Sequence, residues 1–562
     1  MRNLLKENLK MIICLTFKTT FENKIITFNP ILHASMKMKK LLPFAASAFF
    51  CSLPLSANVL YWVDATSYFN ADASGTLDGR NIWDLHRNFS DVEKSEYSDN
   101  YNWAAGYAVR EVSLQDPESG QTTVYYVPVY EYASTVTAPD ENTDVYFKFS
   151  DFSTGNAETG YRYRIAGSPV LQADTAVKSI TVESANDNWL MFRTNGYDLT
   201  VVEDVSFNST AVSWIGGSSA SNIRIGGNVY TYDNSVSRYH AVRLGGDGVG
   251  AIAIGGDIIF ENSGRIQMST SGAESTFEAP QTAVGGIVNF SGYAARLDLG
   301  RRSATEQFYS FGGLSGSNSG AVISTDAEAY SNGLVSTLVL ANSSDAVFAG
   351  KITNPATAED NASTALVNTV NVVMNGSAAQ TLSGDNDFRG YVTVQSGTLL
   401  LRTANGAAHG KLTLNGGKFG AIGNAAFSSA EWNGGSIGFF NTDEAVAVMT
   451  PETVTINGEF LKAGSGKIAV DFNGIDAYDL IDNGQWYDLI EAASLSGFSD
   501  EADDDFIAAN LSGGYAEFQW VDGDIGKVLQ VSFSSVPEPA AVALLLGFPA
   551  LAFAARKRRL SK

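Results

Sequence analysis

Residues 225–230 read IGGNVY, and this stretch decides the fold because it returns along the chain at a nearly constant spacing. An apolar residue, two glycines and a short apolar or aromatic segment occur again at residues 254–260, 284–290 and 311–314. The first glycines of the four copies are Gly226, Gly255, Gly285 and Gly312. A loose but persistent period of this kind is typical of proteins in which similar units stack on one another.

A second set of glycine-rich turns follows, with LNGG at 414–417, WNGG at 432–435 and INGE at 456–459. Short alternating strands such as 391–401 accompany these turns, and Asn-Gly-Gly supplies the positive φ angles that tight turns need. Helical periodicity is nearly absent over residues 58–535. We therefore predict an all-β solenoid whose coils stack at about 4.8 Å, with a β-sandwich array as the alternative architecture.

The chain divides into segments of different composition. Residues 58–175 are rich in Trp, Tyr and Asn, with a strand expected at 124–130, and are predicted to form an N-terminal β cap, because a solenoid end exposes unpaired backbone. Residues 176–470 are predicted to hold the solenoid repeats, at about 25 residues per coil. Residues 471–535 are predicted to form a C-terminal β cap, in which the acidic run 500–505 is expected to be a solvated loop.

Composition and charge exclude some classes of partner. The 562 residues include 37 Lys or Arg against 60 Asp or Glu, so the formal charge is −23 and binding to nucleic acid phosphates is disfavoured. A hydrophobic content of 44% permits a sizeable core and argues against disorder. Basic residues gather near the two ends, within 1–57 and 556–562, and bracket an acidic body.

The N-terminal basic residues precede an apolar run at 41–51, which ends in the small-residue stretch SLPLSA. This order is typical of a secretory signal peptide, predicted at 36–57 with cleavage after Ala57. Residues 1–35 would then be an upstream extension, with translation starting at Met36 or Met38.

Cysteine usage agrees with export of a chain that has no disulfide. The two cysteines, Cys14 and Cys51, both precede the predicted cleavage site, so the mature chain would contain none. Its stability is therefore expected to come from packing. A lipoprotein anchor at Cys51 is not favoured, because Phe49 and Phe50 stand where small residues are required.

The mature chain offers few residues for catalysis or metal binding. Its histidines, His86, His240 and His409, are far apart in sequence, and without cysteine neither thiolate nor zinc chemistry is expected. Residues 464–467 read GSGK but lack the first glycine and the Ser or Thr of a phosphate-binding loop, so a turn is expected there. We expect no cofactor and no metal.

The main enzymatic alternative is a β-helix polysaccharide lyase or glycoside hydrolase. Such an enzyme needs paired carboxylates, and a basic residue for lyase chemistry, on one face of the solenoid. Asp298 with Arg301 and Arg302 is the best local cluster for this role. Strand alternation can place such residues outward without any catalytic purpose, so we interpret the cluster as a solvated turn and assign no catalytic residue.

Residues 380–399 read QTLSGDNDFRGYVTVQSGTL and resemble the autotransporter-associated β-strand repeat, whose pattern is L-S-G-x-N-x-[FY]-x-G-x-[TV]-x-[VI]-x-x-G-[TS]-L. The match continues through 412–417, and residues 336–340 with 348–352 look like a more degenerate copy. Repeats of that family form a right-handed parallel β-helix, so the resemblance implies this fold, whereas the periodicity alone indicates a solenoid. The chain lacks the C-terminal membrane strands of an autotransporter translocator, so self-export is not expected.

The C-terminus carries a short motif, an apolar run and a basic stop, in that order. They are Val536, Pro537, Glu538 and Pro539; residues 540–555; and Arg556, Lys557, Arg558 and Arg559. As a helix the run would be about 24 Å long, which can span a bilayer with local thinning, and the basic stop would hold its end in the cytoplasm.

This arrangement resembles the PEP-CTERM sorting signal of Gram-negative bacteria. The resemblance implies that a dedicated membrane protease recognises the motif and releases the chain toward the surface of exopolysaccharide-producing cells. A permanent tail anchor is the alternative. The chain would thus be held transiently in the inner membrane and then reach the cell surface or be secreted.

The function predicted from these features is that of a noncatalytic, exported cell-surface or extracellular-matrix protein. A long repeat surface provides extended binding area without a pocket. Its expected partners are the sorting protease and the export machinery, together with polysaccharide or neighbouring surface proteins. Nucleic acid is not expected among them, because the body is acidic.

Overall fold

The computed structural model describes strand segments between residues 58 and 130 and, with short gaps, residues 139–149, 171–232, 242–354, 368–439, 453–477 and 484–535. Contacts divide the chain into two units, residues 1–56 and 57–562, and the described residues all belong to the second. The predicted signal peptide, including Ala57, and the predicted sorting signal lie outside the described residues.

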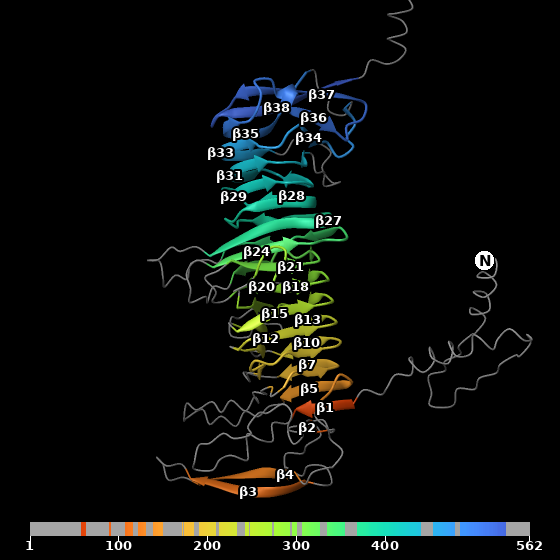
Figure 1. The fold of residues 1–562 in the computed structure, drawn as a ribbon, viewed down its shortest axis with the longest axis vertical. Coiled ribbons are helices and arrows are strands. Elements are labelled where there is room, and N and C mark those ends of the chain that lie inside the picture. Colours follow the sequence, from red (N-terminus) through yellow and green to blue (C-terminus); the bar gives the residue numbers. More distant parts are fainter. Residues whose placement is uncertain are drawn as a thin grey trace, which may run out of the picture. The chain divides into compact units, whose positions relative to one another are not determined.

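Strands account for nearly all of the regular structure that is described. The one described helix, α5 (Ala502–Asp505), has four residues. Most strands pair in parallel and stack one above another, as the arrows in Figure 1 show. The predicted all-β class is therefore confirmed, and the parallel pairing contradicts the β-sandwich alternative, whose sheets are antiparallel.

Over residues 179–340, three consecutive strands form one coil, and each contributes to a different parallel sheet. Sheet 1 stacks β1 (Asn58–Trp62), β5 (Thr143–Phe149), β7 (Ser179–Ser184), β10 (Val205–Ser209), β13 (Val229–Thr231), β16 (Ile258–Phe260), β19 (Val288–Phe290) and β22 (Leu314–Ser315). Sheet 2 stacks β8 (Leu190–Arg193), β11 (Ser213–Gly216), β14 (Val242–Gly245), β17 (Arg265–Ser269), β20 (Arg296–Leu299), β23 (Val322–Thr325) and β26 (Lys351–Ile352).

Sheet 3 begins with β6 (Thr175–Val177), β9 (Leu199–Val201), β12 (Ser221–Ile225), β15 (Val249–Ile254), β18 (Thr282–Val284), β21 (Gln307–Phe311) and β24 (Val335–Leu340). It continues through β25 (Ala346–Phe348), β27 (Thr369–Asn386), β28 (Val392–Thr403), β29 (His409–Leu414), β30 (Lys418–Ile422), β31 (Ala425–Trp432), β32 (Ser436–Gly438), β33 (Val454–Lys462), β34 (Ile468–Asp471), β35 (Trp486–Ser496) and β36 (Phe506–Ala509). The long strand β27 pairs with both β24 and β25, so a single strand borders two segments of the preceding coil.

The first set of sequence repeats corresponds to the stacking of the coils. Val229, Ile258, Val288 and Leu314 are paired in register, each one coil apart and each fully buried. Each of them follows the glycine pair of its own copy, so the coil length in this part of the chain equals the sequence period. We call residues 175–325 the wide coils.

Stacked phenylalanines fill the interior of the wide coils. Phe260 and Phe290 are paired in register, and their ring centroids lie 4.9 Å apart with nearly parallel planes. Phe348 continues the column at 4.9 Å from Phe290. All three side chains are fully buried. Side chains of one kind at the same register position thus produce a continuous apolar core along the stack.

The coils become narrower from β27 on. Val372 pairs with Val392, Val392 with Leu412, and Leu412 with Ala430, so each partner follows the one before it more closely in sequence than in the wide coils. We call residues 369–439 the narrow coils. They include residues 380–399.

The buried side chain of Asn386 ties neighbouring coils together. Its Oδ1 accepts a hydrogen bond of 2.8 Å from the Ile352 backbone N–H, in the coil before. Its Nδ2 donates to the Gly384 carbonyl at 2.8 Å, within its own coil, and to the Arg402 carbonyl at 2.9 Å, in the coil after. One fully buried side chain therefore links three successive coils.

The second set of turns stacks only in part as the sequence suggests. Leu414 and Trp432, which begin its first two copies, are paired in register. Trp432, however, pairs next with Lys462, whereas Ile456 pairs with Phe427. The third copy of the turn is therefore not INGE at 456–459 but the segment that follows Lys462, which sequence similarity alone does not identify.

The N-terminal part contains both antiparallel and parallel pairs. β3 (Tyr107–Gln115) and β4 (Thr122–Tyr130) form an antiparallel hairpin, and β4 contains the strand expected at 124–130. β2 (Phe89–Ser90) pairs antiparallel with β1. β1 and β5 nevertheless pair in parallel with each other, and β5 with β7, so sheet 1 already begins within the segment predicted as a cap.

The described C-terminal strands end the parallel stack with antiparallel pairs. β38 (Lys527–Ser535) pairs antiparallel with β35 on one side and with β37 (Gly514–Asp522) on the other. This three-stranded sheet lies within residues 471–535. The acidic run 500–505 is not a fully solvated loop, because it contains α5, and Ala502 and Asp505 are each 2% exposed.

Candidate functional site

Asp298, the carboxylate considered for glycan chemistry, lies on strand β20 and is fully buried. One of its oxygens accepts from the Nε of Arg265, which lies on β17, and the other accepts from the Nε of Arg296 at 2.7 Å. The interpretation of this cluster as a solvated turn is therefore wrong. The predicted neighbours Arg301 and Arg302 lie outside the described residues.

This geometry makes Asp298 an ion-pairing residue rather than an exposed acid or base. Arg265 and Arg296 are in register on adjacent coils, so one carboxylate joins two coils through two guanidinium groups. Charge-assisted hydrogen bonds of this kind are strong, and a buried charge without its partner is costly. A carboxylate with no solvent exposure cannot reach a polysaccharide in the described arrangement.

A second polar cluster, not singled out from the sequence, surrounds Glu306. Its Oε1 accepts hydrogen bonds from the hydroxyl of Thr337, from the amide of Asn371 at 3.3 Å and from the hydroxyl of Tyr391 at 2.9 Å. Asn371 also donates to Thr337 at 3.0 Å. The glutamate is far from the tyrosine in sequence, so the cluster becomes visible only when the register of the coils is known.

Tyr391 is the group in this cluster whose proton affinity is clearly changed. Burial raises the pKa of Tyr391 to about 12, with a smaller contribution in the same direction from the carboxylate of Glu306. At neutral pH the phenol is therefore protonated and donates its hydrogen bond. It is suited to orienting a neighbour and is a poor general base.

His409, one of the three histidines of the mature chain, lies in the core of the narrow coils. Its Nδ1 is 2.7 Å from the Phe388 carbonyl, to which it must donate, and its Nε2 is 3.0 Å from the Thr403 hydroxyl, from which it accepts. Its ring packs between Phe388 and Phe427. Burial lowers the pKa of His409 to about 4, so this histidine is neutral and structural. His86 and His240 lie outside the described residues.

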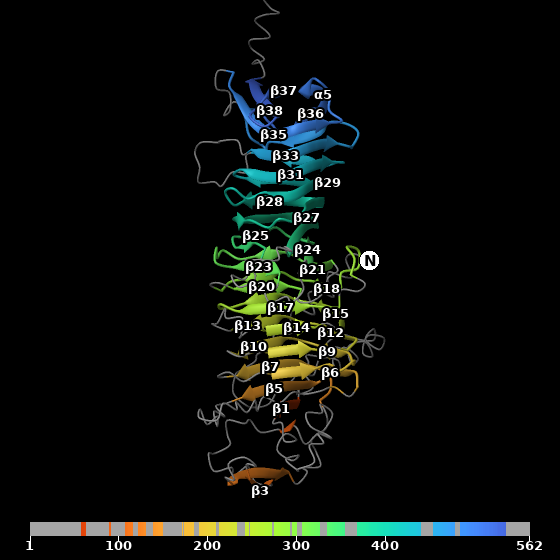
Figure 2. The same cartoon turned by 90° about the vertical axis from the view of Figure 1, so that its left-hand side faces the viewer.

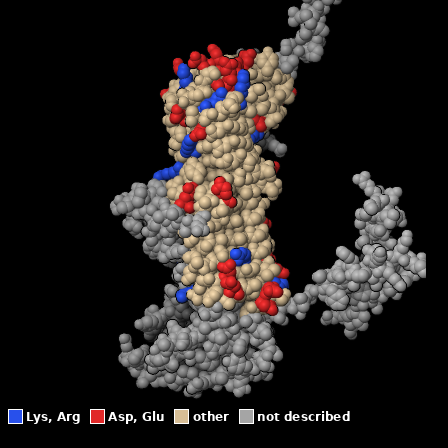
Figure 3. Space-filling model, viewed as in Figure 1, with Lys and Arg blue, Asp and Glu red and all other residues tan. Residues whose placement is uncertain are grey.

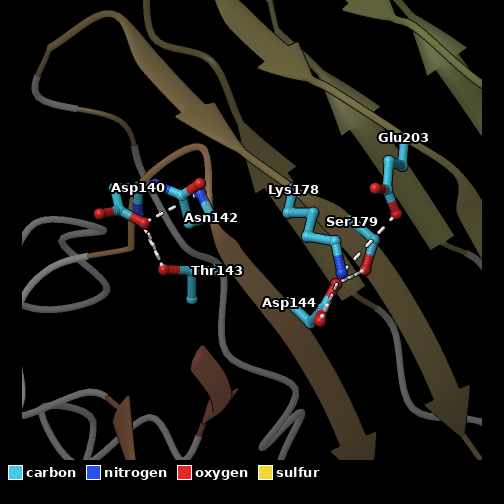
Figure 4. Close-up of polar contacts among 7 residues, drawn as sticks. All are labelled: Asp140, Asn142, Thr143, Asp144, Lys178, Ser179 and Glu203. Atoms are coloured by element: carbon cyan, nitrogen blue, oxygen red, sulfur yellow. Dashed lines mark hydrogen bonds and ion pairs between the residues drawn. The ribbon is translucent and has the colours of Figure 1, made fainter. Parts of the chain in front are cut away.

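Charged side chains link the first described coils at their surface (Figure 4). Lys178 lies 3.2 Å from Asp144 and 3.8 Å from Glu203, and Ser179 donates to Asp144 at 2.6 Å. The hydrogen bond to Asp144 raises the pKa of Lys178. The network joins β5, β7 and the residues before β10, and it places one lysine between two carboxylates.

A ladder of side-chain amides runs across the narrow coils at the surface. Asn433 donates to the Oδ1 of Asn415 at 2.8 Å, and Asn415 donates to the Oε1 of Gln395 at 3.1 Å. These three residues, which we call the amide ladder, follow register partners on successive coils. Asn415 and Asn433 are exposed. Asn433 also donates to the Oε1 of Glu431 at 3.0 Å, so both of its N–H donors are engaged and its amide oxygen is the group available to a ligand.

The amide ladder could have been recognised from the sequence. Asn415 and Asn433 occupy the same position of two adjacent NGG turns, and Gln395 precedes Asn415 by one coil. Beside the ladder, Lys411 forms an ion pair with Glu431, and this hydrogen bond lowers the pKa of Glu431. The charges next to the ladder therefore compensate each other.

Residues 464–467 form the expected turn. β33 ends at Lys462, β34 begins at Ile468, and Gly466 has a φ of 95°. The ammonium of Lys467 donates to the backbone carbonyl of Asp503 and is engaged within the protein. Among the described residues, no group of three or more His, Cys, Asp or Glu side chains is arranged to hold a metal ion.

A small pocket lies between the last narrow coils and strands β33 and β35. Its volume of about 10 Å³ leaves room for roughly one water molecule. It is lined mainly by apolar side chains, including Leu412, Phe419 and Phe460. Such a void belongs to the packing of the core and could not admit a glycan.

The predicted sorting residues cannot be placed in the fold. Val536, Pro537, Glu538, Pro539 and the basic stop at 556–559 all lie outside the described residues, as does the apolar run 540–555. Within the part of the chain that is described, no helix is both long and apolar enough to cross a bilayer. Comparison with protein-family models and with curated proteins gives no match for this chain.

Proposed function

We propose that this chain is a noncatalytic, exported cell-surface or extracellular-matrix protein whose solenoid binds polysaccharide along its outer surface. The proposal includes the finer fold suggested by the repeat resemblance, a right-handed parallel β-helix. It also includes export through the signal peptide at 36–57 and sorting through residues 536–562. Exopolysaccharide and neighbouring surface proteins are the proposed partners.

The observation that carries the proposal is the amide ladder, in which Asn415 and Asn433 are exposed and Gln395 is half-buried. Side-chain amides offer both donors and acceptors, which is the combination needed to bind the hydroxyl groups of a sugar chain. Successive coils repeat these groups at about 4.8 Å. An extended polymer can therefore contact several of them at once, and the weak contacts then add.

Surface charge supports a hydroxyl-rich ligand rather than a strongly charged one. In the view of Figure 3, most of the described surface belongs to uncharged residues, and charged groups lie scattered between them except at the C-terminal end of the stack, where acidic ones gather. Lys411 and Glu431, next to the amide ladder, are paired with each other. A neutral polysaccharide can approach such a surface without the desolvation cost of an unpaired charge.

Binding is tested with the purified chain on a panel of neutral and acidic polysaccharides, by co-sedimentation and by calorimetry. We expect binding to at least one neutral polymer, weakened roughly tenfold or more when Gln395, Asn415 and Asn433 are all changed to Ala. The matched control changes Asn262 and Asn424, which are exposed asparagines outside the ladder, to Ala. Equal binding by the two variants would exclude the amide ladder as the binding surface.

The alternative function, a β-helix polysaccharide lyase or glycoside hydrolase, draws on the half-buried cluster around Glu306 and Tyr391. The same panel therefore includes detection of new reducing ends and of unsaturated products. No turnover is expected. Turnover that is lost in both Glu306→Gln and Tyr391→Phe variants would replace the binding function by the enzymatic one.

Sorting is tested separately from binding. Replacing Pro537, Glu538 and Pro539 by Ala is expected to leave the chain uncleaved in the inner membrane, whereas deleting residues 536–562 is expected to release it into the periplasm. Fractionation of the producing cells distinguishes these outcomes. Normal processing of the triple-Ala variant would show that the motif is not a sorting signal here.

A further inference from the structure

The polar cluster around Glu306 draws its side chains from four neighbouring strands of sheet 3. Glu306 immediately precedes β21, and Figure 2 shows β21, β24, β27 and β28 following one another along the stack. Phe308 is in register with Thr337, and Thr337 with Asn371. The backbone N–H of Tyr391 donates to the Asn371 Oδ1 at 3.1 Å and so adds the next coil. The register of the coils therefore fixes the cluster.

Every side-chain donor of this cluster is already engaged. The hydroxyls of Thr337 and Tyr391 and one amide N–H of Asn371 donate to the Oε1 of Glu306. The other amide N–H of Asn371 donates to Thr337 at 3.0 Å. Three donors therefore hold one carboxylate oxygen, and the four side chains have no donor left to offer a ligand.

The groups that remain for a ligand are acceptors. The Oε2 of Glu306 has no donor among the described residues, and the side chain is only half-buried, so this oxygen can be reached from solvent. Tyr391 is also half-buried, and its phenolic oxygen keeps acceptor capacity after donating its proton. Such a site excludes anions and favours a ligand that carries several donors and no acceptor.

The carboxylate also lacks a compensating charge. Among the described residues, no lysine or arginine forms an ion pair with Glu306, and Lys411, one coil beyond Tyr391, is paired with Glu431. A partly desolvated carboxylate without a cation is costly, so a cation that takes this place is stabilised.

The chemistry of the cluster favours an organic cation over a metal ion. Ca²⁺ requires six or more oxygen ligands, usually with several carboxylates among them. In the part of the chain that is described, no group of three or more His, Cys, Asp or Glu side chains could hold a metal ion. A primary ammonium has three donors, no acceptor and a single positive charge, which matches one open carboxylate oxygen beside a phenolic oxygen.

We propose that Glu306 is the centre of a binding site for a primary ammonium group, of the kind carried by an amino sugar or an aliphatic amine. The ammonium donates to the Oε2 of Glu306 and to the phenolic oxygen of Tyr391, while Thr337 and Asn371 hold the carboxylate from its other side. The site goes beyond the proposed function, because it is separate from the amide ladder and takes a charged group instead of a neutral polymer.

Calorimetric titration of the purified chain, at about pH 6 and about 0.15 M salt, tests the site. The probes are glucosamine trimer, putrescine and, as the uncharged counterpart, N-acetylglucosamine trimer. We expect at least one of the two amines to bind, and Glu306→Gln to weaken that binding roughly tenfold or more. The substitution keeps an acceptor for the three donors and removes only the charge. Which amine depends on Glu306 shows whether an amino sugar, an aliphatic amine or both are accepted.

Two control variants separate this site from other binding. Glu459→Gln removes the same charge from an exposed position on β33 of the same sheet, and it should leave amine binding unchanged. The variant with Ala at Gln395, Asn415 and Asn433 should keep its amine binding at Glu306, so this site and the amide ladder can fail independently.

A second substitution is available should Glu306→Gln not fold, as judged by circular dichroism. Glu306→Asp keeps the charge but is one methylene shorter, so its carboxylate cannot meet the three donors and the ligand in the same position. We then expect amine binding to weaken roughly severalfold.

Four results would overturn the proposal. The first is a wild type that binds neither amine, and the second is a folded position-306 variant that binds the amines as the wild type does. The third is an equal loss in Glu459→Gln, because the overall negative charge would then account for the binding. The fourth is an acetylated trimer that depends on Glu306 as strongly as the amines, because the site would then take neutral donors.

Discussion

The glycine-rich turns of the wide coils and of the narrow coils look alike in sequence but require glycine for different reasons. In the wide coils, Gly256 has no left-handed φ, yet a Cβ there would lie 2.8 Å from the carbonyl carbon of Gly227 in the coil before. In the narrow coils, Gly417 and Gly435 have φ values of 62° and 86°. A Cβ at either of these two positions would also lie within 2.5 Å of a backbone carbonyl oxygen in the coil before. The same letters therefore report a close approach of two backbones alone at Gly256, and a close approach together with a left-handed conformation in the narrow coils.

The two regions also differ in how neighbouring coils are tied together. In the wide coils, each turn residue accepts a hydrogen bond from the next coil: Asp204 from the backbone N–H of Asn228, and Asn228 from that of Asp257. In the narrow coils, the single side chain of Asn386 joins three coils. We therefore expect stability to be spread over many small contacts in the wide coils and concentrated in a few buried polar residues in the narrow coils.

Asn386→Ala is expected to have the largest effect. It leaves the Ile352 N–H and several carbonyls without their partner inside a buried turn, and each buried unsatisfied group costs about 1–3 kcal/mol. We expect the free energy of unfolding to fall by about 3–5 kcal/mol in urea titrations.

Asn433→Ala is the matched control for Asn386→Ala. Asn433 is exposed, so the same substitution there is expected to change the free energy of unfolding by less than about 1 kcal/mol. A similar loss in both variants would contradict the view that buried polar residues concentrate the stability of the narrow coils.

Acid is expected to destabilise the narrow coils through His409. Its pKa of about 4 in the folded chain lies below the ordinary value of 6.5, so the unfolded chain binds the proton more readily. The contribution of neutral His409 is complete above pH 6.5 and is lost as the pH falls toward 4. The full loss is about 3 kcal/mol, at about 1.4 kcal/mol for each unit of pKa difference.

Comparison with His409→Gln isolates this effect from the carboxylates, which titrate in both proteins. Urea unfolding at several pH values between 8 and 4 should show the stability difference between wild type and variant shrinking as the pH falls. A difference that stays constant over this range would mean that His409 does not titrate as its burial implies.

The wide coils show how much of the fold the sequence can predict. The spacing of the IGGNVY copies gives both the coil length and the register of Val229, Ile258 and Val288, because each copy repeats the same turn at the same place. Just after the narrow coils, the third NG turn, at 456–459 in β33, predicts the wrong register. The reason is physical: pairing follows the buried residues, and Phe427 finds its match at Ile456.

The candidate sites are less predictable than the fold. The sequence singles out Asp298 as a candidate site residue because arginines follow it. Its described partners are instead Arg265, from the coil before, and Arg296, which precedes it on its own strand. Glu306 has no neighbour in sequence that would indicate Tyr391. Contacts between coils depend on the length of every intervening loop, and those lengths vary too much for spacing alone to reveal them.

Gly256→Ala tests the close approach of backbones in the wide coils and is expected to have the smallest effect of the three. The added methyl group would meet the backbone of Gly227 and the Oδ1 of Asn228, at 2.8 and 2.3 Å, so the two turns must move apart. Overpacking of this kind costs about 1–3 kcal/mol. Gly250→Ala in the same coil is the control, because its Cβ would come no closer than 3.2 Å to Asn222. The midpoint temperature of thermal unfolding should therefore fall for Gly256→Ala but not for Gly250→Ala. Equal midpoints in the two variants would mean that the wide-coil turns can accommodate a Cβ at Gly256.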